Sequence, residues 1–196
     1  MDGGQIPAHY TDLGAAERAA WDMMVRGAND RRHAFHQMTV ATVENGLPEL
    51  RTVVLRGAER DPGRVRFHTD TRSAKYAALT ADPRCAAHFY DHGAKVQVRL
   101  RGEAVLHNRD NMTAQIWAGM RDFSKKCYRQ PVGPGDTLQS PEDAEADLLS
   151  EAAGYENFVV AFINTRAVEW LYLAAAGHRR ALIQSAQEPR AVWLAP

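Results

Sequence analysis

Residues 95–102 read Lys-Val-Gln-Val-Arg-Leu-Arg-Gly, an alternation of apolar and polar side chains. Successive side chains of an extended chain point to opposite faces, so this pattern predicts a β-strand with one buried face and one polar face. We expect the strand to cover residues 94–107. It should pair with a strand over residues 85–91 through a turn at His92-Gly93. An antiparallel pair therefore lies at the centre of the predicted fold.

Further β-rich segments lie on both sides of this pair. Those before it are joined by short turns at Asn45-Gly46 and Asp61-Pro62-Gly63, which predicts an antiparallel meander. The strands expected before the pair cover residues 35–43, 50–56 and 65–69. Those expected after it cover residues 158–163, 167–173, 179–184 and 191–194.

Helical segments are few and lie between or outside the strands. An amphipathic helix capped by Asp12 or Thr11 is expected over residues 12–29, and a short helix over residues 73–80. Residues 108–120 and 141–153, the latter capped by Ser140, complete the set. Residues 131–141 hold three prolines and two glycines and are expected to form a loop.

The fold class is therefore mainly β with peripheral helices (α+β), in the form of an antiparallel barrel. We expect residues 1–196 to form a single domain. Residues 1–30 would be an N-terminal helical segment, and residues 108–153 a helical and loop insertion.

The overall composition narrows the function classes. Lys and Arg together number 24, and Asp and Glu also number 24. This balance gives no reason to expect nucleic acid or an anionic membrane as partner. Two cysteines without metal-site spacing favour a reducing, cytoplasmic location and predict no metal site. No stretch is apolar enough over a sufficient length to predict a membrane span.

The first candidate functional segment is Arg-Thr-Val-Val-Leu-Arg at residues 51–56. Arg51 and Arg56 differ by an odd number of positions, so their side chains point to opposite faces of a regular strand. One arginine would then serve a ligand and the other a second site. The alternative is that both are solvated arginines at strand ends.

The second candidate segment, residues 67–75, runs from a strand into a helix. Its hydroxyl groups and Lys75 fall in the first turn, where exposed N–H groups and the helix dipole attract phosphate. The alternative is an ordinary capped helix with a surface lysine.

Two further segments offer groups suited to a planar, polar-edged ligand. Gln97 supplies both a donor and an acceptor on a strand face. Residues 169–173 bring aromatic side chains close to the basic run at residues 178–180. A surface glutamine, and core aromatics followed by a solvated basic turn, are the alternatives.

In combination and in this order, these motifs resemble the pyridoxamine 5'-phosphate oxidase family and its FMN-binding split β-barrel. The motifs are Arg-x-Val-x-Leu-Arg at 51–56, Phe-x-Thr-x-x-x-Ser-x-Lys at 67–75 and Gln-Val-Arg-x-x-Gly at 97–102. The similar stretch covers residues 35–107, with a weaker tail from Asn157 to the end.

The resemblance implies a set of FMN-binding positions. Arg51, Ser73 and Lys75 would bind the FMN phosphate, and the backbone of Thr52, Val53 and Val54 would lie along the flavin ring. The other implied contacts are His68, Thr69, Gln97, Trp170 and Arg180. FMN lies between two subunits in such proteins, which implies a homodimer with two equivalent sites.

The sequence also departs from the family pattern. Ala74 occupies a position where the family often has an arginine. Residues 108–120 lack the Tyr, Arg and Ser set that holds a substrate phosphate in the B6 oxidases. The C-terminal run His178-Arg179-Arg180 is out of register with the family's final motif, and a shift of one residue would put Leu171 in place of Trp170. Residues 128–135 look more like a flavoprotein subgroup of the same superfamily.

These observations favour an FMN-dependent oxidoreductase with a small-molecule substrate that the sequence does not define. No catalytic acid–base pair stands out, although His68 is the best nearby candidate. One alternative is a true pyridoxamine 5'-phosphate oxidase, with Arg56 and Arg179 at the substrate phosphate. The others are a non-catalytic protein that binds flavin, haem or another tetrapyrrole, and a structural dimer with an empty cleft.

Overall fold

A single antiparallel sheet of nine strands forms the body of the structure, a computed structural model that describes residues 7–145, 147–185 and 190–196. The strands follow one another in space as β2-β1-β5-β6-β7-β4-β3, with β8 on β7 and β9 on β8. Their bounds are β1 Gln37–Glu44, β2 Leu47–Val54, β3 Gly57–Glu59, β4 Arg64–Asp70, β5 Arg84–Asp91, β6 Val96–His107, β7 Phe158–Tyr172, β8 Arg179–Gln184 and β9 Ala191–Leu194.

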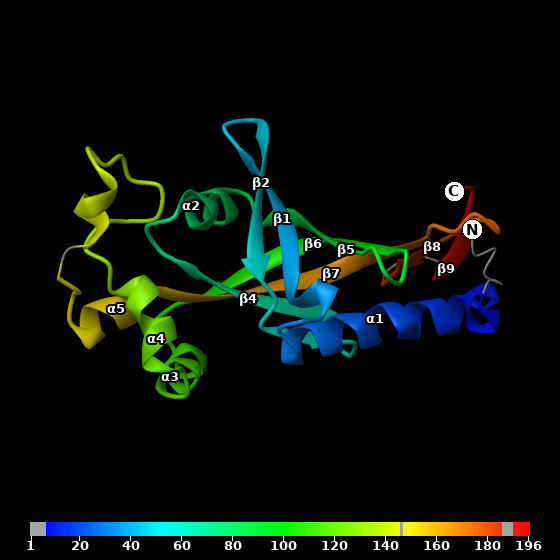
Figure 1. The fold of residues 1–196 in the computed structure, drawn as a ribbon, viewed down its shortest axis with the longest axis horizontal. Coiled ribbons are helices and arrows are strands. Elements are labelled where there is room, and N and C mark those ends of the chain that lie inside the picture. The colour runs from blue at the N-terminus through cyan, green and yellow to red at the C-terminus, as the bar shows by residue number, and fades with distance from the viewer. Residues whose placement is uncertain (1–6, 146, 186–189) are drawn as a thin grey trace.

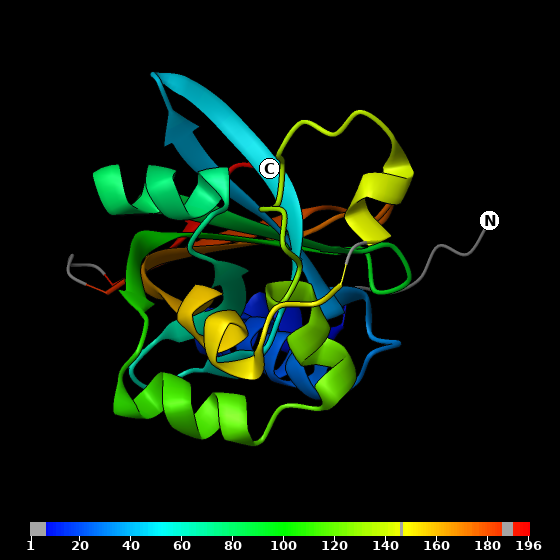
Figure 2. The same ribbon diagram turned by 90° about the vertical axis from the view of Figure 1, so that its left-hand side faces the viewer.

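The helices cover the outside of this sheet (Figure 1). The longest, α1, runs beneath the sheet, α2 lies above it, and α3, α4 and α5 gather at one end. Figure 2, the end-on view, shows α2 and α3 on opposite sides of the strands. Their bounds are α1 Leu13–Asn29, α2 Ala74–Ala81, α3 Asn111–Ala118, α4 Asp122–Lys125 and α5 Glu151–Asn157, with 3-10 turns η1 Ala8–Thr11, η2 Ala34–His36, η3 Lys126–Tyr128 and η4 Pro141–Glu145.

The N-terminal helix forms as the sequence predicts. The Asp12 side chain caps α1 by accepting a hydrogen bond from the Ala15 N–H at 2.7 Å. One face of α1, which includes Trp21 and Met24, is buried in the main core. Gly27 allows the close approach to Phe35, because a Cβ there would lie 2.6 Å from the Phe35 carbonyl carbon.

The alternating pattern of residues 95–102 is confirmed. Val96, Val98 and Leu100 are fully buried, whereas Arg99 and Arg101 are exposed. Strands β8 and β9 also have the predicted bounds. Residues 131–140 contain no strand or α-helix, as the prolines and glycines there indicate.

The expected break between two strands at residues 164–166 is wrong, because β7 is continuous from Phe158 to Tyr172. Arg101 of β6 pairs with Ala167 and Gly102 pairs with Thr165, so Arg166 is an extra residue on β7. This β-bulge absorbs the polar interruption that the sequence shows there.

The predicted meander is right for its first two strands, β1 and β2, which pair antiparallel, and wrong for its third. The third of its strands, β4, pairs with β7 and with the short β3, which the sequence analysis missed, and not with β2. After β2 the chain turns across the barrel. The Leu55 N–H donates to the His36 carbonyl at 2.9 Å, and the Arg56 N–H donates to the Arg66 carbonyl at 2.7 Å. β2 is therefore an edge strand.

The helix expected over residues 141–153 does not form. Residues 141–145 form a 3-10 turn and residues 147–150 form no helix; the Leu149 N–H donates to the Arg129 carbonyl at 2.7 Å. The Arg129 Nε donates back to the Leu149 carbonyl at 2.7 Å. The helix begins only at Glu151, after the cap Ser150. These tertiary bonds outweigh the local helix signals.

Replacing Gly102 with alanine should lower the free energy of unfolding by about 1–3 kcal/mol, the usual cost of overpacking. The reason is that a Cβ at Gly102 would lie 2.1 Å from the Asn164 carbonyl oxygen in β7. Urea unfolding measures the change. Gly119→Ala is the matched control, because a Cβ at Gly119 has no neighbour nearer than 3.7 Å. Equal stability of the two variants would contradict the close approach of β6 and β7.

Candidate functional site

The turn between β4 and α2 is built around Ser73. Its Oγ caps α2 by accepting from the Tyr76 N–H at 3.4 Å and donates to the Asp70 carbonyl at 2.8 Å. Thr69 Oγ1 lies 3.0 Å from Ser73 Oγ. Both hydroxyl residues are buried, so the start of α2 is held in one position by side chains that the motif at residues 67–75 supplies.

Arg51 and Lys75 lie close to one another at this turn. Arg51, in β2, donates from Nη1 to Thr42 Oγ1 at 2.6 Å and to the Glu49 carbonyl at 3.2 Å. Burial and the positive charge of Arg51 lower the pKa of Lys75, with a smaller opposing effect from Asp70. Within the described residues neither cation forms an ion pair with an acid. Two neighbouring cations at a helix start are an arrangement that attracts an anion.

The segment that follows η3 reaches the same turn. Arg72 forms a bidentate ion pair with Asp70 and donates from Nη1 to the Gln130 carbonyl at 2.7 Å. The side-chain oxygen Oε1 of Gln130 is buried without a hydrogen-bond partner. A buried acceptor of this kind destabilises the folded state unless a donor forms a hydrogen bond with it. The sequence analysis assigned no role to Gln130.

Gln97 and Trp170 do not lie on the same face of the sheet. Gln97 is half-buried and pairs in register with Leu171 of β7, so Leu171 and not Trp170 is its neighbour on that face. Trp170 is fully buried in the core against Tyr10, and its Nε1 has no hydrogen-bond partner.

Arg180 lies on the same outer face as Leu171 and Gln97. Its Nε donates to Glu169 Oε1 at 3.0 Å, and Arg99 Nη2 donates to Glu169 Oε2 at 2.5 Å. Burial alone would raise the pKa of Glu169, but the two arginines outweigh it and lower that pKa. Glu169 thus stays ionised and fixes both guanidinium groups.

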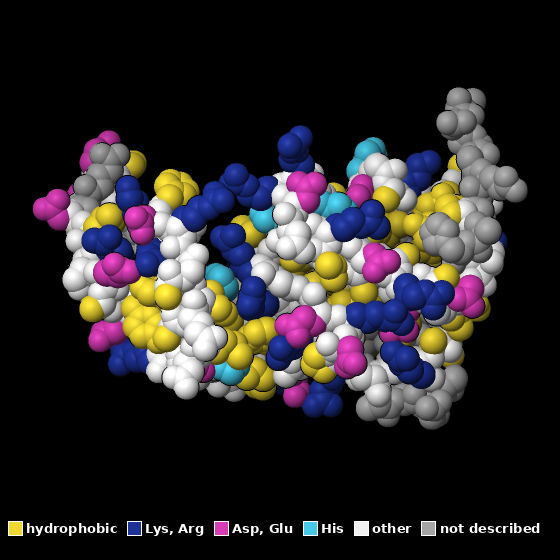
Figure 3. Space-filling view, turned by 90° about the horizontal axis from the view of Figure 1, so that it is seen from below, with side chains coloured by type: hydrophobic (Ala, Val, Ile, Leu, Met, Phe, Trp, Pro, Cys, Tyr) yellow, Lys and Arg dark blue, Asp and Glu magenta, His cyan; other side chains and the backbone are white. Residues whose placement is uncertain are grey.

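A second group of cations surrounds a cavity of about 370 Å³ between α1, β4 and α4, which we call the arginine cavity. In Figure 3 the surface is hollowed beside the end that holds α3–α5, and Lys and Arg side chains gather there. No acidic side chain is among its described lining residues, which are Asn29, Arg31, Arg56, His68, Met120, Arg121 and Ser124.

The sequence analysis found two of these lining residues, Arg56 and His68. Arg31, Arg121 and Ser124 were not predicted, because a single arginine in a connection, or a single serine in a helix as short as α4, carries no periodic signal. Arg179, the expected companion of Arg56, instead lines a separate cavity of about 310 Å³ with Trp193. Within one chain the structure therefore does not bring Arg56 and Arg179 together.

His68 forms part of the wall of the arginine cavity. Burial, followed by the charges of Arg56 and Arg66, lowers its pKa to about 3. Nε2 is buried without a partner, and the ring packs edge-on against Phe158 at 5.0 Å. His68 is therefore a neutral side chain at neutral pH, beside cations that remain charged.

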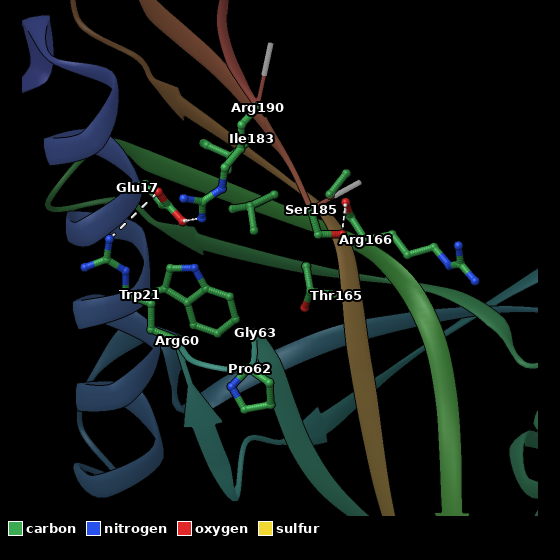
Figure 4. Close-up of a pocket in the computed structure, with 12 residues that line it drawn as sticks. Glu17, Trp21, Arg60, Pro62, Gly63, Thr165, Arg166, Ile183, Ser185 and Arg190 are labelled. Carbon is green, nitrogen blue, oxygen red and sulfur yellow. Dashed lines mark hydrogen bonds and ion pairs between the residues drawn. The ribbon is translucent and has the colours of Figure 1, made fainter. Parts of the chain in front are cut away.

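Another cavity, of about 80 Å³, lies between α1 and the turn after β3. Figure 4 shows Glu17 pointing between Arg60 and Arg190. Glu17 Oε1 accepts from Arg190 at 2.6 Å, and Arg60 lies 3.8 Å from Oε2. The ion pairs of Glu17 connect α1 to the C-terminal strands. Because this buried acid is already paired, the cavity is not a candidate site.

Comparison with known proteins bears on the motifs described above. Residues 18–108 match the family described as the FMN-binding domain of pyridoxamine 5'-phosphate oxidase. Residues 18–108, slightly less than half of the chain, are therefore similar to that FMN-binding domain. This match confirms the resemblance that the three motifs indicated. The matched residues include β1 to β6 and both arginines at residues 51–56.

Curated relatives of the FMN-binding domain carry the oxidase name. A pyridoxine/pyridoxamine 5'-phosphate oxidase of Azorhizobium caulinodans is 48% identical over 66 residues, which are 33% of this chain and only 30% of that protein. Pyridoxine/pyridoxamine 5'-phosphate oxidase 2 of Arabidopsis thaliana is 28% identical over 69% of this chain and 74% of its own length.

Solved structures confirm the split-barrel fold. A pyridoxamine 5'-phosphate oxidase-related, FMN-binding protein from Nostoc punctiforme superimposes with a TM-score of 0.73 at 23% identity, over 91% of this chain and 97% of that one. PhzG from Burkholderia lata, solved with tetrahydrophenazine-1-carboxylic acid, gives 0.74 at 18% identity over the whole of both chains.

The residues present fit the cofactor that this domain implies. Among the described residues Arg51 and Lys75 form no ion pair with an acid, the start of α2 offers N–H groups, and the buried Oε1 of Gln130 has no donor. None of the helices in the described ranges has the length and apolar content that a bilayer crossing requires. The same ranges contain no cluster of His, Cys, Asp and Glu suited to a metal ion.

Acid should destabilise the protein through His68. Its pKa of about 3 in the folded chain lies below the ordinary value of 6.5. Between these two values the unfolded chain binds a proton that the folded chain does not, so stability falls as the pH falls. From pH 7.5 to 5.0 the wild type should lose about 2 kcal/mol more than His68→Phe does in urea unfolding. The same loss in both proteins would show that His68 is protonated when folded.

Proposed function

We propose that this chain is an FMN-dependent oxidoreductase that binds the cofactor phosphate between Arg51 and Lys75. The observation that carries the proposal is the pair of neighbouring cations at the start of α2, neither of which forms an ion pair with an acid among the described residues, since the nearby Asp70 is paired with Arg72. A phosphate dianion there would relieve the repulsion between the two cations and accept hydrogen bonds from the free N–H groups of the helix. Ser73 and Thr69 position that turn.

Other described groups are proposed to contact the rest of the cofactor. The backbone of Thr52, Val53 and Val54 follows Arg51 along β2. The buried Gln130 Oε1 belongs to the segment that contacts the turn between β4 and α2. On the other face of the sheet, Gln97 and Arg180 would contact the flavin of a second subunit. We propose Leu171, which pairs with Gln97, in place of the core residue Trp170.

When bound, FMN supplies the hydride-accepting chemistry and passes the electrons on to an acceptor. The residues of the chain bind and orient the cofactor and exclude water from it. His68 lines the arginine cavity as a neutral ring whose Nε2 is buried without a hydrogen-bond partner, and we propose it as a hydrogen-bonding contact of the substrate or the flavin ring.

Purified protein should bind FMN with a one-to-one stoichiometry, and Arg51→Ala/Lys75→Ala should weaken that binding at least 100-fold. Each lost charge-assisted hydrogen bond costs about 1.5–3 kcal/mol, and each 1.4 kcal/mol is a factor of ten. Flavin fluorescence quenching measures the dissociation constant, and the chromophore is identified after release.

Arg18→Ala/Lys126→Ala is the control, since it also removes two cations, both of them exposed and outside this site. It should bind FMN as the wild type does. A wild type that fails to bind added FMN, or that carries haem instead, would overturn the proposed function.

A homodimer is proposed as the working form. The edge strand β2 exposes two large apolar side chains, Leu47 at 64% and Leu50 at 63%. A second copy would cover them and would bring its own Gln97 and Arg180 to the cofactor.

We further propose that residues 1–196 form one domain, because one main core joins α1 to strands from both halves of the chain. Cys85 and Cys127 are free, which agrees with a cytoplasmic location.

The second candidate function is oxidation of pyridoxamine 5'-phosphate itself. The arginine cavity favours it, because Arg31, Arg56 and Arg121 face the cavity without an acid and Ser124 adds a hydroxyl. Such a set suits a phosphate monoester. Arg121 and Ser124 would then be a counterpart, just beyond that segment, of the substrate-phosphate set sought at residues 108–120.

If this second function holds, Arg121→Ala should raise KM for pyridoxamine 5'-phosphate by roughly 10–100-fold, the value of one charge-assisted contact. Activity on pyridoxamine, which lacks the phosphate, should not change. Oxygen consumption by the FMN-loaded enzyme measures both. Arg109→Ala, at the other end of α3 and paired with Glu156 at 3.6 Å, is the control. No turnover of the phosphate ester by the wild type would eliminate this function and leave the first.

A further inference from the structure

Arg72 joins two segments that are far apart in the sequence. Its Nε and Nη2 donate to the two carboxylate oxygens of Asp70 at 2.9 and 2.8 Å, which leaves Nη1 to donate to the Gln130 carbonyl at 2.7 Å. The planar fork of a guanidinium makes all three bonds possible at once. Arg72 is therefore a bridge between the turn before α2 and the segment after η3.

The bridge is anchored in the protein interior. Asp70 is only 4% exposed, and its Oδ1 also accepts from the Arg72 N–H at 2.9 Å. The bonds to Asp70 raise the pKa of Arg72, so the guanidinium stays charged. Because the pair is neutral overall, it does not oppose an anion bound nearby at Lys75.

The far side of the bridge is packed as well as bonded. A Cβ on Gly133 would lie 3.1 Å from the Arg72 Cβ, so the backbone of the segment passes directly over Arg72. Gly133 N–H donates to Asp136 Oδ2 at 2.7 Å, which closes the segment into a turn. Residues 129–136 thus have a fixed position against the start of α2, and Gln130 makes the contact with Arg72 through its own carbonyl.

The other end of α2 carries a pair with the same local design but without the bridge. Asp82 and Arg84 stand two residues apart, as Asp70 and Arg72 do, and Arg84 Nε and Nη2 bind Asp82 at 2.9 and 2.6 Å. The Arg84 side chain, however, hydrogen-bonds no other segment among the described residues, and it is 78% exposed. The third bond, to Gln130, is what distinguishes Arg72.

We infer that Arg72 is a positioning residue, which holds residues 129–136 against the start of α2 and so keeps the Gln130 side chain at the cofactor. This inference rests on the proposed function, because it takes FMN to be the ligand beside Lys75. It gives a role to the segment at residues 128–135, which the sequence marks as unlike the B6 oxidases. Arg72 itself need not touch the phosphate.

The test compares Arg72→Gln with Arg84→Gln in the full-length protein. FMN release on dilution is followed by the rise in flavin fluorescence. Arg72→Gln should release FMN about ten times faster than the wild type, the effect of losing one charge-assisted bond. Arg84→Gln should release it at the wild-type rate.

A second readout needs no cofactor. In the protein freed of FMN, amide hydrogen exchange of residues 129–136 should speed up in Arg72→Gln, whereas exchange in β6 and β7 should not change. A general loss of stability would speed exchange in all of these segments, and that result would overturn the positioning role.

Arg72→Lys separates geometry from charge. Lysine keeps the positive charge but cannot bind both oxygens of Asp70 and reach the Gln130 carbonyl together. We expect it to release FMN as fast as Arg72→Gln does. Wild-type release by Arg72→Lys would mean that Arg72 only neutralises Asp70, and would overturn the inference. Failure of the wild type to bind FMN at all would instead count against the proposed function.

Discussion

The pairing of β7 with three other strands organises the whole molecule. One edge of β7 pairs with β6 along almost its full length. The other edge pairs with β4 over residues 158–164 and with β8 over residues 167–172. The extra residue Arg166 lies where these two partners change. Because one strand serves two partners on the same edge, the sheet divides around it, and the barrel is split and not closed.

This division places the candidate functional groups. β4, on one half, leads into the turn at Ser73 and puts Lys75 close to Arg51 of the edge strand β2. β8, on the other half, brings Arg180 to the outer face that Gln97 and Leu171 share. Groups from one chain thus fall into two sets on separate faces, and two-fold pairing of chains is the arrangement that would combine them.

Sequence alone was most informative where the signal is local. The alternation at residues 96–100, the Asp12 cap and the strand at residues 179–184 depend on near neighbours, and all are confirmed. The third strand of the meander and the helix over residues 141–153 were predicted wrongly, because β4 pairs with β7 and Leu149 bonds Arg129, contacts that no local pattern encodes.

The residues of the candidate site also differ in how far the sequence predicts them. Arg51, Ser73 and Lys75 belong to short motifs of fixed spacing, and the structure gathers them. Arg31 and Arg121 come from two separate connections and meet only in the folded chain. The choice between Trp170 and Leu171 depended on strand parity, which a shift of one residue inverts.

The uncompensated charge of the arginine cavity has a consequence for how ligands arrive. Its potential reaches well beyond the surface in dilute buffer, but is screened within about 8 Å at physiological ionic strength. Anions should therefore associate with it faster at low salt, and the association rate should fall as salt is added. Sulfate or phosphate in a buffer would compete for the same guanidinium groups, so the apparent affinity for any anionic ligand depends on the solution in which it is measured.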